Sequence, residues 1–177
     1  VWSVPIGSGY SGPVVWQGRV YVTDYRPKPE TKLLEAIERV LCLDEKTGKK
    51  LWSHEWETHY RRQLHSYATG PRATPLVANG RLYTLGATGR MHCFDAKTGK
   101  AHWVHDTLSR IWGSTLVVDG KVYIGTEDGE IVILEAGKEK KILNTVDMGA
   151  PVYSSPVFAN GTLYISTQTH LYAIGGK

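Results

Sequence analysis

The chain has 177 residues, of which 41% are hydrophobic and 21% are charged, and its formal net charge is +4. This composition is typical of a folded globular protein and excludes a disordered chain. No segment approaches the ~18 uninterrupted apolar residues of a membrane-spanning helix, and residues 1–7 lack the charged and apolar regions of a signal peptide. We therefore expect either a cytoplasmic protein or one whose leader has been removed.

The first predicted elements are a strand at residues 1–4 and a β-hairpin, and the hairpin recurs three times along the chain. The four hairpins cover residues 11–23, 73–85, 113–125 and 154–166. Their turns are Gln17-Gly18, Asn79-Gly80, Asp119-Gly120 and Asn160-Gly161. Such pairs supply the positive φ angles of a two-residue turn. Apolar residues flank every turn, which predicts strands covered on both faces.

An insertion at residues 25–39 follows the first hairpin. The spacing of Leu33, Leu34 and Ile37 after Pro29 predicts a short helix over residues 29–39. The link at residues 55–70 is also long. Both segments belong to the face of the molecule that carries the turns between second and third strands, so we expect this loop-bearing face to hold the binding surface.

A third strand follows each hairpin, at residues 40–43, 91–94, 131–134 and 171–174, and a fourth strand carries Trp52 or Trp103. Four strands in a unit of ~40 residues define a propeller blade. We therefore predict a single all-β domain over residues 1–177, a four-bladed β-propeller of four-stranded antiparallel blades. The blades are expected at about residues 10–56, 72–105, 112–147 and 152–177, the last one completed by residues 1–4.

A recurring turn motif identifies the type of repeat. Its residues are Asp44, Gly48 and Trp52 in blade 1 and Asp95, Gly99 and Trp103 in blade 2. This pattern resembles the tryptophan-docking motif of pyrroloquinoline-quinone-type propeller repeats, a family that includes quinoprotein alcohol dehydrogenases and an outer-membrane assembly lipoprotein. Blade 3 departs from the motif, because Leu143 stands near the tryptophan position.

Trp2 is expected to supply the missing docking tryptophan of blade 4, since Val1-Trp2-Ser3-Val4 is similar to residues 51–54. Pairing of the N-terminal strand with the last blade would cover an exposed sheet edge. Two assemblies remain open at this point. The sequence favours a monomeric ring of four blades, and the alternative is a ring of eight blades in which two chains exchange their end strands.

Four aligned residues begin the innermost strands at the expected mouth of the central channel: Tyr10, Arg72, Trp112 and Tyr153. Aromatic rings and a guanidinium suit a flat or anionic ligand, by stacking and by paired hydrogen bonds. They equally suit a plug that fills a narrow channel. Lysines gather on the opposite face, but no aromatic residues alternate with them, which argues against nucleic acid as a partner.

No catalytic residue or metal site emerges from the pattern. The histidine spacings match no zinc motif, and the haem attachment sequence Cys-x-x-Cys-His is absent. Cys42 and Cys93 occupy equivalent places in two blades and are expected to be buried and unpaired. In the quinone-dependent relatives an aromatic residue forms the floor of the cofactor site, a place that Trp112 alone among the tryptophans could take.

The leading hypothesis is a non-catalytic propeller that binds a protein, a peptide or a saccharide on its loop-bearing face, in the periplasm or outside the cell. It requires no cofactor. The first alternative is a quinone-dependent oxidoreductase with pyrroloquinoline quinone and calcium. The second is a purely architectural protein, either a minimal ring or half of a larger one.

Overall fold

Four antiparallel sheets make up the structure, a computed structural model that describes residues 1–28, 35–60 and 69–175. The described residues form strands and turns but no helix. Within them there is accordingly no helix long and apolar enough to cross a membrane. The predicted all-β class is confirmed.

Each sheet is a meander, and we call the four sheets blades 1 to 4 in chain order. Blade 1 contains β1 (Val14–Trp16), β2 (Arg19–Pro27), β3 (Glu35–Asp44) and β4 (Lys50–His59). Blade 2 contains β5 (Leu76–Ala78), β6 (Arg81–Leu85), β7 (Arg90–Asp95) and β8 (Ala101–Asp106). Blade 3 contains β9 (Leu116–Val118), β10 (Lys121–Gly125), β11 (Glu130–Glu135) and β12 (Ile142–Asp147). Blade 4 has three strands, β13 (Val157–Ala159), β14 (Thr162–Ser166) and β15 (Leu171–Gly175).

The hairpin turns have the backbone conformation that their sequences predict. Asn79 has a φ of 49° and Gly80 one of 72°, and the other three turns repeat this pair of positive angles. Two positive φ angles in succession match the twist of the strands on either side. Even Gln17, in the least typical turn, has a φ of 45°.

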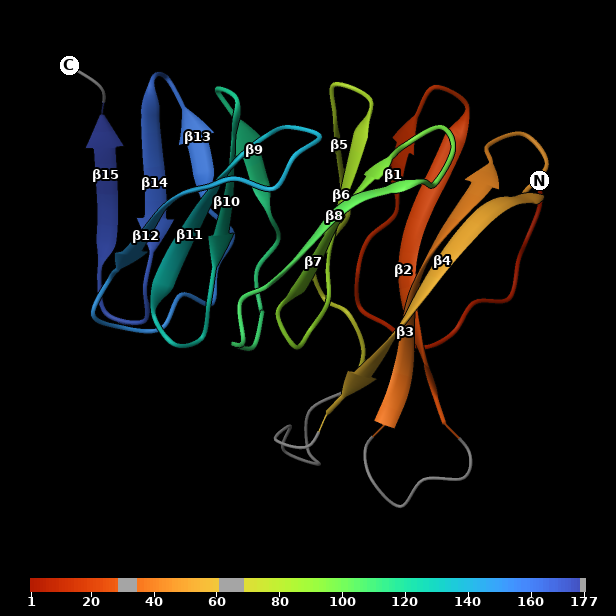
Figure 1. The fold of residues 1–177 in the computed structure, drawn as a ribbon, viewed down its shortest axis with the longest axis horizontal. Coiled ribbons are helices and arrows are strands. Elements are labelled where there is room, and N and C mark those ends of the chain that lie inside the picture. Colours follow the sequence, from red (N-terminus) through yellow and green to blue (C-terminus); the bar gives the residue numbers. More distant parts are fainter. Residues whose placement is uncertain (29–34, 61–68, 176–177) are drawn as a thin grey trace.

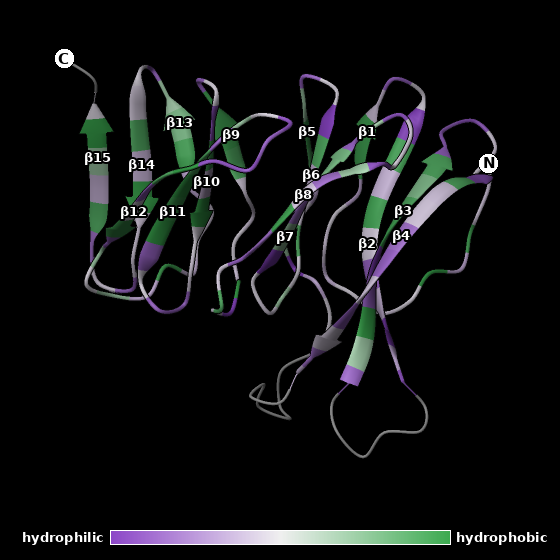
Figure 2. Cartoon of the chain, viewed as in Figure 1, coloured by the Kyte–Doolittle hydropathy of each residue, from purple (hydrophilic) through white to green (hydrophobic). Residues whose placement is uncertain are grey.

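Adjacent blades pack face to face through apolar side chains. Tyr21 pairs with Cys42 across blade 1, and both lie in a cluster with Leu82 and Phe94 of blade 2. The equivalent pair in blade 2, Tyr83 and Cys93, packs on blade 3 in the same manner. Because each of these blades is covered by a neighbour, its second and third strands are largely buried, whereas the fourth strand β4 is more exposed and mostly hydrophilic in colour (Figure 2).

The blades stand side by side in chain order, and the two termini lie at opposite ends of the row (Figure 1). Residues 1–7 form no strand and lie against blade 1, where Val4 packs beside Val22, Leu41 and Leu43. Closure of the ring by pairing of residues 1–4 with β15 is therefore not shown. Blade 4 remains a sheet of three strands.

The helix predicted over residues 29–39 is wrong for its second half, because residues 35–39 belong to β3. Arg26 pairs with Ile37 and Pro27 with Ala36, so β2 and β3 continue as one long hairpin. Burial alternates along β3, with Ala36, Glu38 and Val40 inside. This period of two excludes a helix, whose apolar residues recur every three or four positions. Residues 29–34 lie outside the described residues.

Candidate functional site at the inner ends of the blades

The four residues expected at the channel mouth occupy the same place before β1, β5, β9 and β13, at the loop-bearing end of each blade. Cζ of Arg72 lies 4.5 Å from the centroid of the Trp112 ring, a cation–π contact. Tyr153 meets the same ring edge to face, with 5.8 Å between the centroids. Tyr10 is 60% exposed and joins blade 2 through its backbone N–H, which donates to the carbonyl of Pro71.

Glu127 fixes the orientation of the Trp112 indole. Its carboxylate accepts a hydrogen bond of 2.8 Å from Nε1 of Trp112 and forms an ion pair of 3.1 Å with Arg110. The backbone N–H of Glu127 also donates to the carbonyl of Arg110. The Asp-Gly sequence that follows Glu127 forms the turn between β10 and β11, as expected. Glu127 thereby holds the Trp112 ring in place against Arg72 and Tyr153.

Hydrogen bonds to hydroxyl groups, which we call the hydroxyl belt, join the inner ends of the blades two residues after these four aligned positions. The backbone N–H of Gly12 donates to Oγ1 of Thr74, and that of Thr74 donates to Oγ of Ser114. The N–H of Ser114 in turn donates to Oγ of Ser155, at 2.7 Å. Since each bond crosses from one blade to the next, the belt fixes the spacing of the four aligned residues.

Glu38 is a buried carboxyl group at the loop-bearing end of blade 1. It accepts hydrogen bonds from Nε1 of Trp56 and from the Tyr60 hydroxyl, and a third from the backbone N–H of Ala87 in blade 2. Burial is the main influence on its pKa and raises it, although these donors oppose the shift. Burial and the neighbouring Glu38 also raise the pKa of Tyr60. The positive charge of Arg72 has the opposite effect and lowers this pKa. Glu38 thus connects blade 1 to blade 2.

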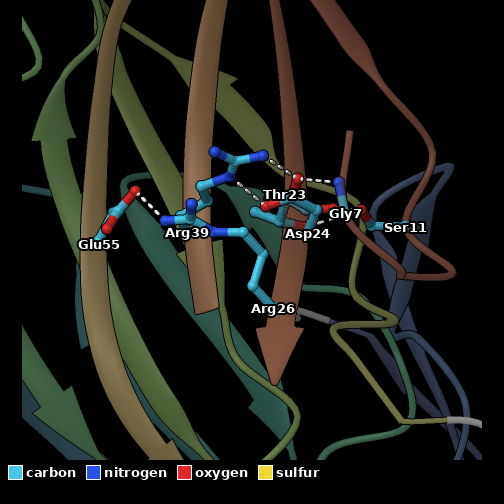
Figure 3. Close-up of polar contacts among 7 residues, drawn as sticks. All are labelled: Gly7, Ser11, Thr23, Asp24, Arg26, Arg39 and Glu55. Carbon is cyan, nitrogen blue, oxygen red and sulfur yellow. Dashed lines mark hydrogen bonds and ion pairs between the residues drawn. The ribbon is translucent and has the colours of Figure 1, made fainter. Parts of the chain in front are cut away.

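A second buried carboxyl group, Asp24, holds the start of the chain against blade 1 (Figure 3). The Arg39 guanidinium donates to both oxygens of Asp24, at 2.6 and 2.7 Å, and the backbone N–H of Gly7 donates to one of them. The Asp24 side chain is fully buried, so its charge requires these partners. Next to it, the hydroxyl of Thr23 donates to that of Ser11, close to the beginning of β1.

The tryptophan-docking residues lie at the junctions between blades rather than at the mouth. A Cβ on Gly48 would lie 2.6 Å from the Trp2 ring, and one on Gly99 would lie 2.6 Å from the Trp52 ring. Asp44 and Asp95 accept hydrogen bonds from the backbone and hydroxyl groups of the threonines three residues later and so fix the turns. Trp103 donates from Nε1 to the carbonyl of Gly137 in blade 3.

Two histidines lie close together at the junction between blades 1 and 2. His54 and His92 face each other across the junction, 5.7 Å apart, and His92 stacks on Phe94. Among the residues that the structure describes, no group of three or more His, Cys, Asp or Glu side chains is placed to hold a metal ion. Burial lowers the pKa of His92 to about 3. His92 therefore stays neutral and packs as an aromatic ring.

Neither the buried position of Glu38 nor the hydroxyl belt was predicted from the sequence. Glu38 was hidden by the predicted helix, although its place between Ala36 and Val40 on alternate positions is a signal of a buried strand residue. The sequence did contain a signal of the belt, because the hydroxyl residues Thr74, Ser114 and Ser155 align at one position of the repeat. Its bonds link residues that are 40 to 62 positions apart in the sequence, so no local pattern predicts them.

Comparison with known proteins places this geometry in a family. In structure, the chain is similar to BamB from Moraxella catarrhalis, with a TM-score of 0.62 and 18% identity over 97% of this chain and 57% of that one. It is also similar to a quinohemoprotein alcohol dehydrogenase from Pseudomonas putida, with a TM-score of 0.64 and 21% identity over 91% of this chain and 28% of that one. These likenesses concern the fold.

Similarity in sequence extends to the same two kinds of protein. Quinohemoprotein alcohol dehydrogenase ADH-IIG of Pseudomonas putida is 27% identical over 141 residues, which are 72% of this chain and 18% of the relative. Outer membrane protein assembly factor BamB of Salmonella typhimurium is 25% identical over 137 residues, 72% of this chain and 32% of the relative. The chain thus spans less than a third of the length of either relative.

A family model described as outer membrane protein assembly factor BamB matches residues 36–141, more than half of the chain. The match includes the docking residues of blades 1 and 2 and the whole of blade 2. The resemblance inferred from the turn motif is confirmed: the protein belongs to the BamB-like family of pyrroloquinoline-quinone-type β-propeller repeats.

Proposed function

We propose that this chain is a non-catalytic binding or scaffold module, and that the row formed by Tyr10, Arg72, Trp112 and Tyr153 is its contact surface. The observation that carries the proposal is the stacking of the Arg72 guanidinium on Trp112, which is continued by Tyr153. Tyr10 and Tyr153 are 60% and 41% exposed, so both rings present area to a partner. Aromatic and arginine side chains dominate the energetics of protein interfaces.

The partner proposed is a protein, a peptide or a saccharide that offers flat or anionic groups to the row. An anionic group would pair with Arg72, and a planar group would stack on the tyrosines. The BamB-like relative is named as an assembly factor for outer membrane proteins, which supports a protein partner and a periplasmic or extracellular setting. Nucleic acid is not proposed, because the lysines lie on the opposite face.

Binding to an array of peptides and oligosaccharides tests this proposal. The purified chain is compared with the double variant Arg72→Ala, Trp112→Ala and with the control Arg26→Ala, which removes an exposed arginine of blade 1. The double variant should lose at least ten-fold in affinity for each probe that binds, whereas the control should bind as the parent does. Equal binding by all three proteins would place the contact surface elsewhere.

Quinone-dependent oxidation is a second candidate, and the names of the dehydrogenase relatives favour it. The residues near Trp112 do not fit a quinone held by calcium. Calcium takes six to eight oxygen ligands, and the one carboxylate that the described residues place on Trp112 is Glu127, already engaged by Trp112 and Arg110. We therefore derive no catalytic step.

A simple assay separates this candidate from the first. Pyrroloquinoline quinone, calcium, an alcohol and an electron-accepting dye are added to the chain, and the quinone absorbance and the dye reduction are followed. Dye reduction that disappears in Trp112→Ala would establish the dehydrogenase and displace the binding proposal. An unchanged quinone spectrum would remove this candidate.

A further inference from the structure

The turns between first and second strands and those between third and fourth strands lie together at one edge of the row of blades (Figure 1). We call this edge the turn face, and it consists of residues 16–19, 44–50, 78–81, 95–101, 118–121, 135–142 and 159–162. The turn face is opposite to the loop-bearing end that carries Tyr10, Arg72, Trp112 and Tyr153. It is therefore separate from the contact surface proposed above.

Charge is distributed unevenly between the turn face and the rest of the described residues. The turn face carries eleven Lys or Arg and six Asp or Glu, a net charge of +5. The remaining described residues carry six Lys or Arg and ten Asp or Glu, a net charge of −4. The small formal charge of the whole chain, +4, thus conceals a separation of charge across the molecule. A field of this kind attracts anionic partners to one face.

Lysine and arginine are separated in the same way. Nine of the eleven basic residues of the turn face are lysines, whereas five of the six elsewhere in the described residues are arginines. Arginines away from the turn face have defined partners, as Arg39 has in Asp24. The two arginines of the turn face, Arg19 and Arg81, donate to backbone carbonyl groups of the chain itself. The basic side chains that remain available on this face are its lysines.

Seven lysines of the turn face direct their charge into solvent. They are exposed and form no ion pair with any residue that the structure describes: Lys46, Lys49, Lys50, Lys97, Lys100, Lys138 and Lys140. The carboxylates of Asp44 and Asp95, by contrast, accept hydrogen bonds from the backbone of their own turns. The charge that this face presents to a partner is therefore positive.

Backbone pairing places a lysine at the same level in three successive blades. The first residue of each turn between third and fourth strands donates its backbone N–H to the carbonyl of a lysine, which is Lys49 in blade 1, Lys100 in blade 2 and Lys141 in blade 3. These blades stand side by side (Figure 1). A flat anionic surface can therefore meet the lysines of all three blades together, whereas a short acidic peptide would reach only part of them.

We propose that the turn face is a docking surface for an anionic lipid membrane. The phosphate groups of such a membrane are spread over a plane and have no single fixed arrangement. A lysine ammonium group is a hydrated point charge on a flexible stem, which suits this diffuse attraction. Each lysine close to an anionic bilayer strengthens binding by roughly five-fold, so the seven act together.

Nucleic acid is the other common polyanion, and it fits the turn face less well. Recognition of nucleic acid relies heavily on arginine, whose planar guanidinium pairs with phosphates and base edges. Both arginines of the turn face are engaged within the chain. Docking on a membrane would also leave the loop-bearing end directed away from the lipid and open to a partner.

Co-sedimentation of the 177-residue chain with lipid vesicles tests the proposal. One set of vesicles consists of phosphatidylcholine, and the other contains about one third of the anionic lipid phosphatidylglycerol. The chain should bind the anionic vesicles roughly ten-fold or more tightly than the neutral ones. High salt should release it, because salt screens the attraction. Equal binding to both kinds of vesicle, or binding to neither, would overturn the proposal.

A triple variant tests the place of the charge: Lys49→Gln, Lys100→Gln, Lys140→Gln. It removes one exposed, unpaired lysine from each of three blades and should weaken binding to the anionic vesicles by roughly a hundred-fold. Arginine at the same three positions keeps the charge and should keep the binding. All three side chains are exposed, so both variants should fold, which circular dichroism verifies.

The matched control, Arg26→Gln, Lys28→Gln, Arg90→Gln, removes the same charge from blades 1 and 2 outside the turn face. It should bind the anionic vesicles nearly as the parent does. A loss equal to that of the lysine variant would show that net charge alone acts, and the turn face would not be the docking surface. Tighter binding of the parent to duplex DNA than to the anionic vesicles, at the same salt concentration, would likewise overturn the proposal. Neither result depends on the residues at the loop-bearing end or on their ligand.

Discussion

The indole ring of Trp52 lies on the backbone of Gly99, where a Cβ atom would approach Cδ2 of the ring to 2.6 Å. Gly99 also has a φ of 74°, which L-residues with side chains rarely adopt. The glycine is thus required twice, once by its conformation and once by the tryptophan of the preceding blade. Trp2 makes the same contact with Gly48. In both turns the glycine leaves space for a tryptophan ring from an earlier part of the chain.

Gly99→Ala should destabilise the protein more than Gly80→Ala. Gly80 has a φ of 72° but nothing within 4 Å of its missing Cβ, so its substitution introduces backbone strain alone, at a cost of ~1 kcal/mol. Gly99→Ala adds overlap with the Trp52 ring and should cost roughly twice as much or more. Urea unfolding of both variants measures the difference, and equal free energies would show that the tryptophan contact contributes nothing.

Asp24→Asn should lower the free energy of unfolding by ~3 kcal/mol, because it leaves the Arg39 guanidinium without its partner at a buried site. Arg39 donates to both oxygens of Asp24, whose side chain is fully buried. The control is Glu55→Gln, which breaks the exposed pair with Arg26 in the same region (Figure 3) and should cost less than ~1 kcal/mol. A loss in Asp24→Asn no greater than in the control would contradict the structural role of the pair.

Acid should destabilise the protein partly through His92, whose pKa burial lowers from the usual 6.5 to about 3. Between these values the unfolded chain binds a proton that the folded chain does not, so the free energy of unfolding rises with pH in this window. The contribution is fully present above pH 6.5 and is lost as the pH falls toward 3, at no more than ~1.4 kcal/mol per pH unit.

His92→Phe should reduce this acid dependence, because the phenyl ring keeps the stacking on Phe94 and binds no proton. Urea unfolding across the same pH range measures the slope. The control is the exposed His170→Gln, which should retain the slope of the parent. If His92→Phe retains it too, protonation of His92 is not what weakens the junction between blades 1 and 2.

Neither thiol should react in the folded protein. Cys42 and Cys93 are fully buried and unpaired, as expected, and burial raises the pKa of the first to about 11 and of the second to about 12. The thiolate, which is the reactive form, is therefore scarce at neutral pH. Titration with a chromogenic disulfide should detect two thiols per chain in denaturant and none without it. Fast reaction of either thiol in the native protein would show that the junctions open.

The sequence predicted the parts of this fold that depend on neighbours along the chain. The Asn79-Gly80 and Asp119-Gly120 turns require positive φ angles that follow from two adjacent residues, and they were predicted correctly. The helix over residues 29–39 was wrong where the structure describes it. Leu33, Leu34 and Ile37 fit a helical spacing, whereas the strand assignment of residues 35–39 comes from pairing with β2.

The candidate site, too, was predicted from the sequence only in part. The alignment placed Tyr10, Arg72, Trp112 and Tyr153 at one level of the repeat, but it could not predict that Arg72 stacks on Trp112 or that Glu127 orients the indole. Those contacts depend on the rotation of each blade relative to the next. A shared position in a repeat determines where a residue lies along its blade. It does not determine how the side chain is oriented or what the side chain contacts.

By itself, then, the sequence determined the repeat, its hairpins and the glycine-containing turns of the tryptophan-docking motif. These features arise from short-range backbone preferences and from regular spacing. The tertiary structure alone decided where the buried carboxyl groups Glu38 and Asp24 find their donors. It also decided that the start of the chain lies on blade 1, where Val4 packs beside Val22 and Leu41. These features are contacts between distant parts of the chain, and their free energies depend on distances that no linear pattern encodes.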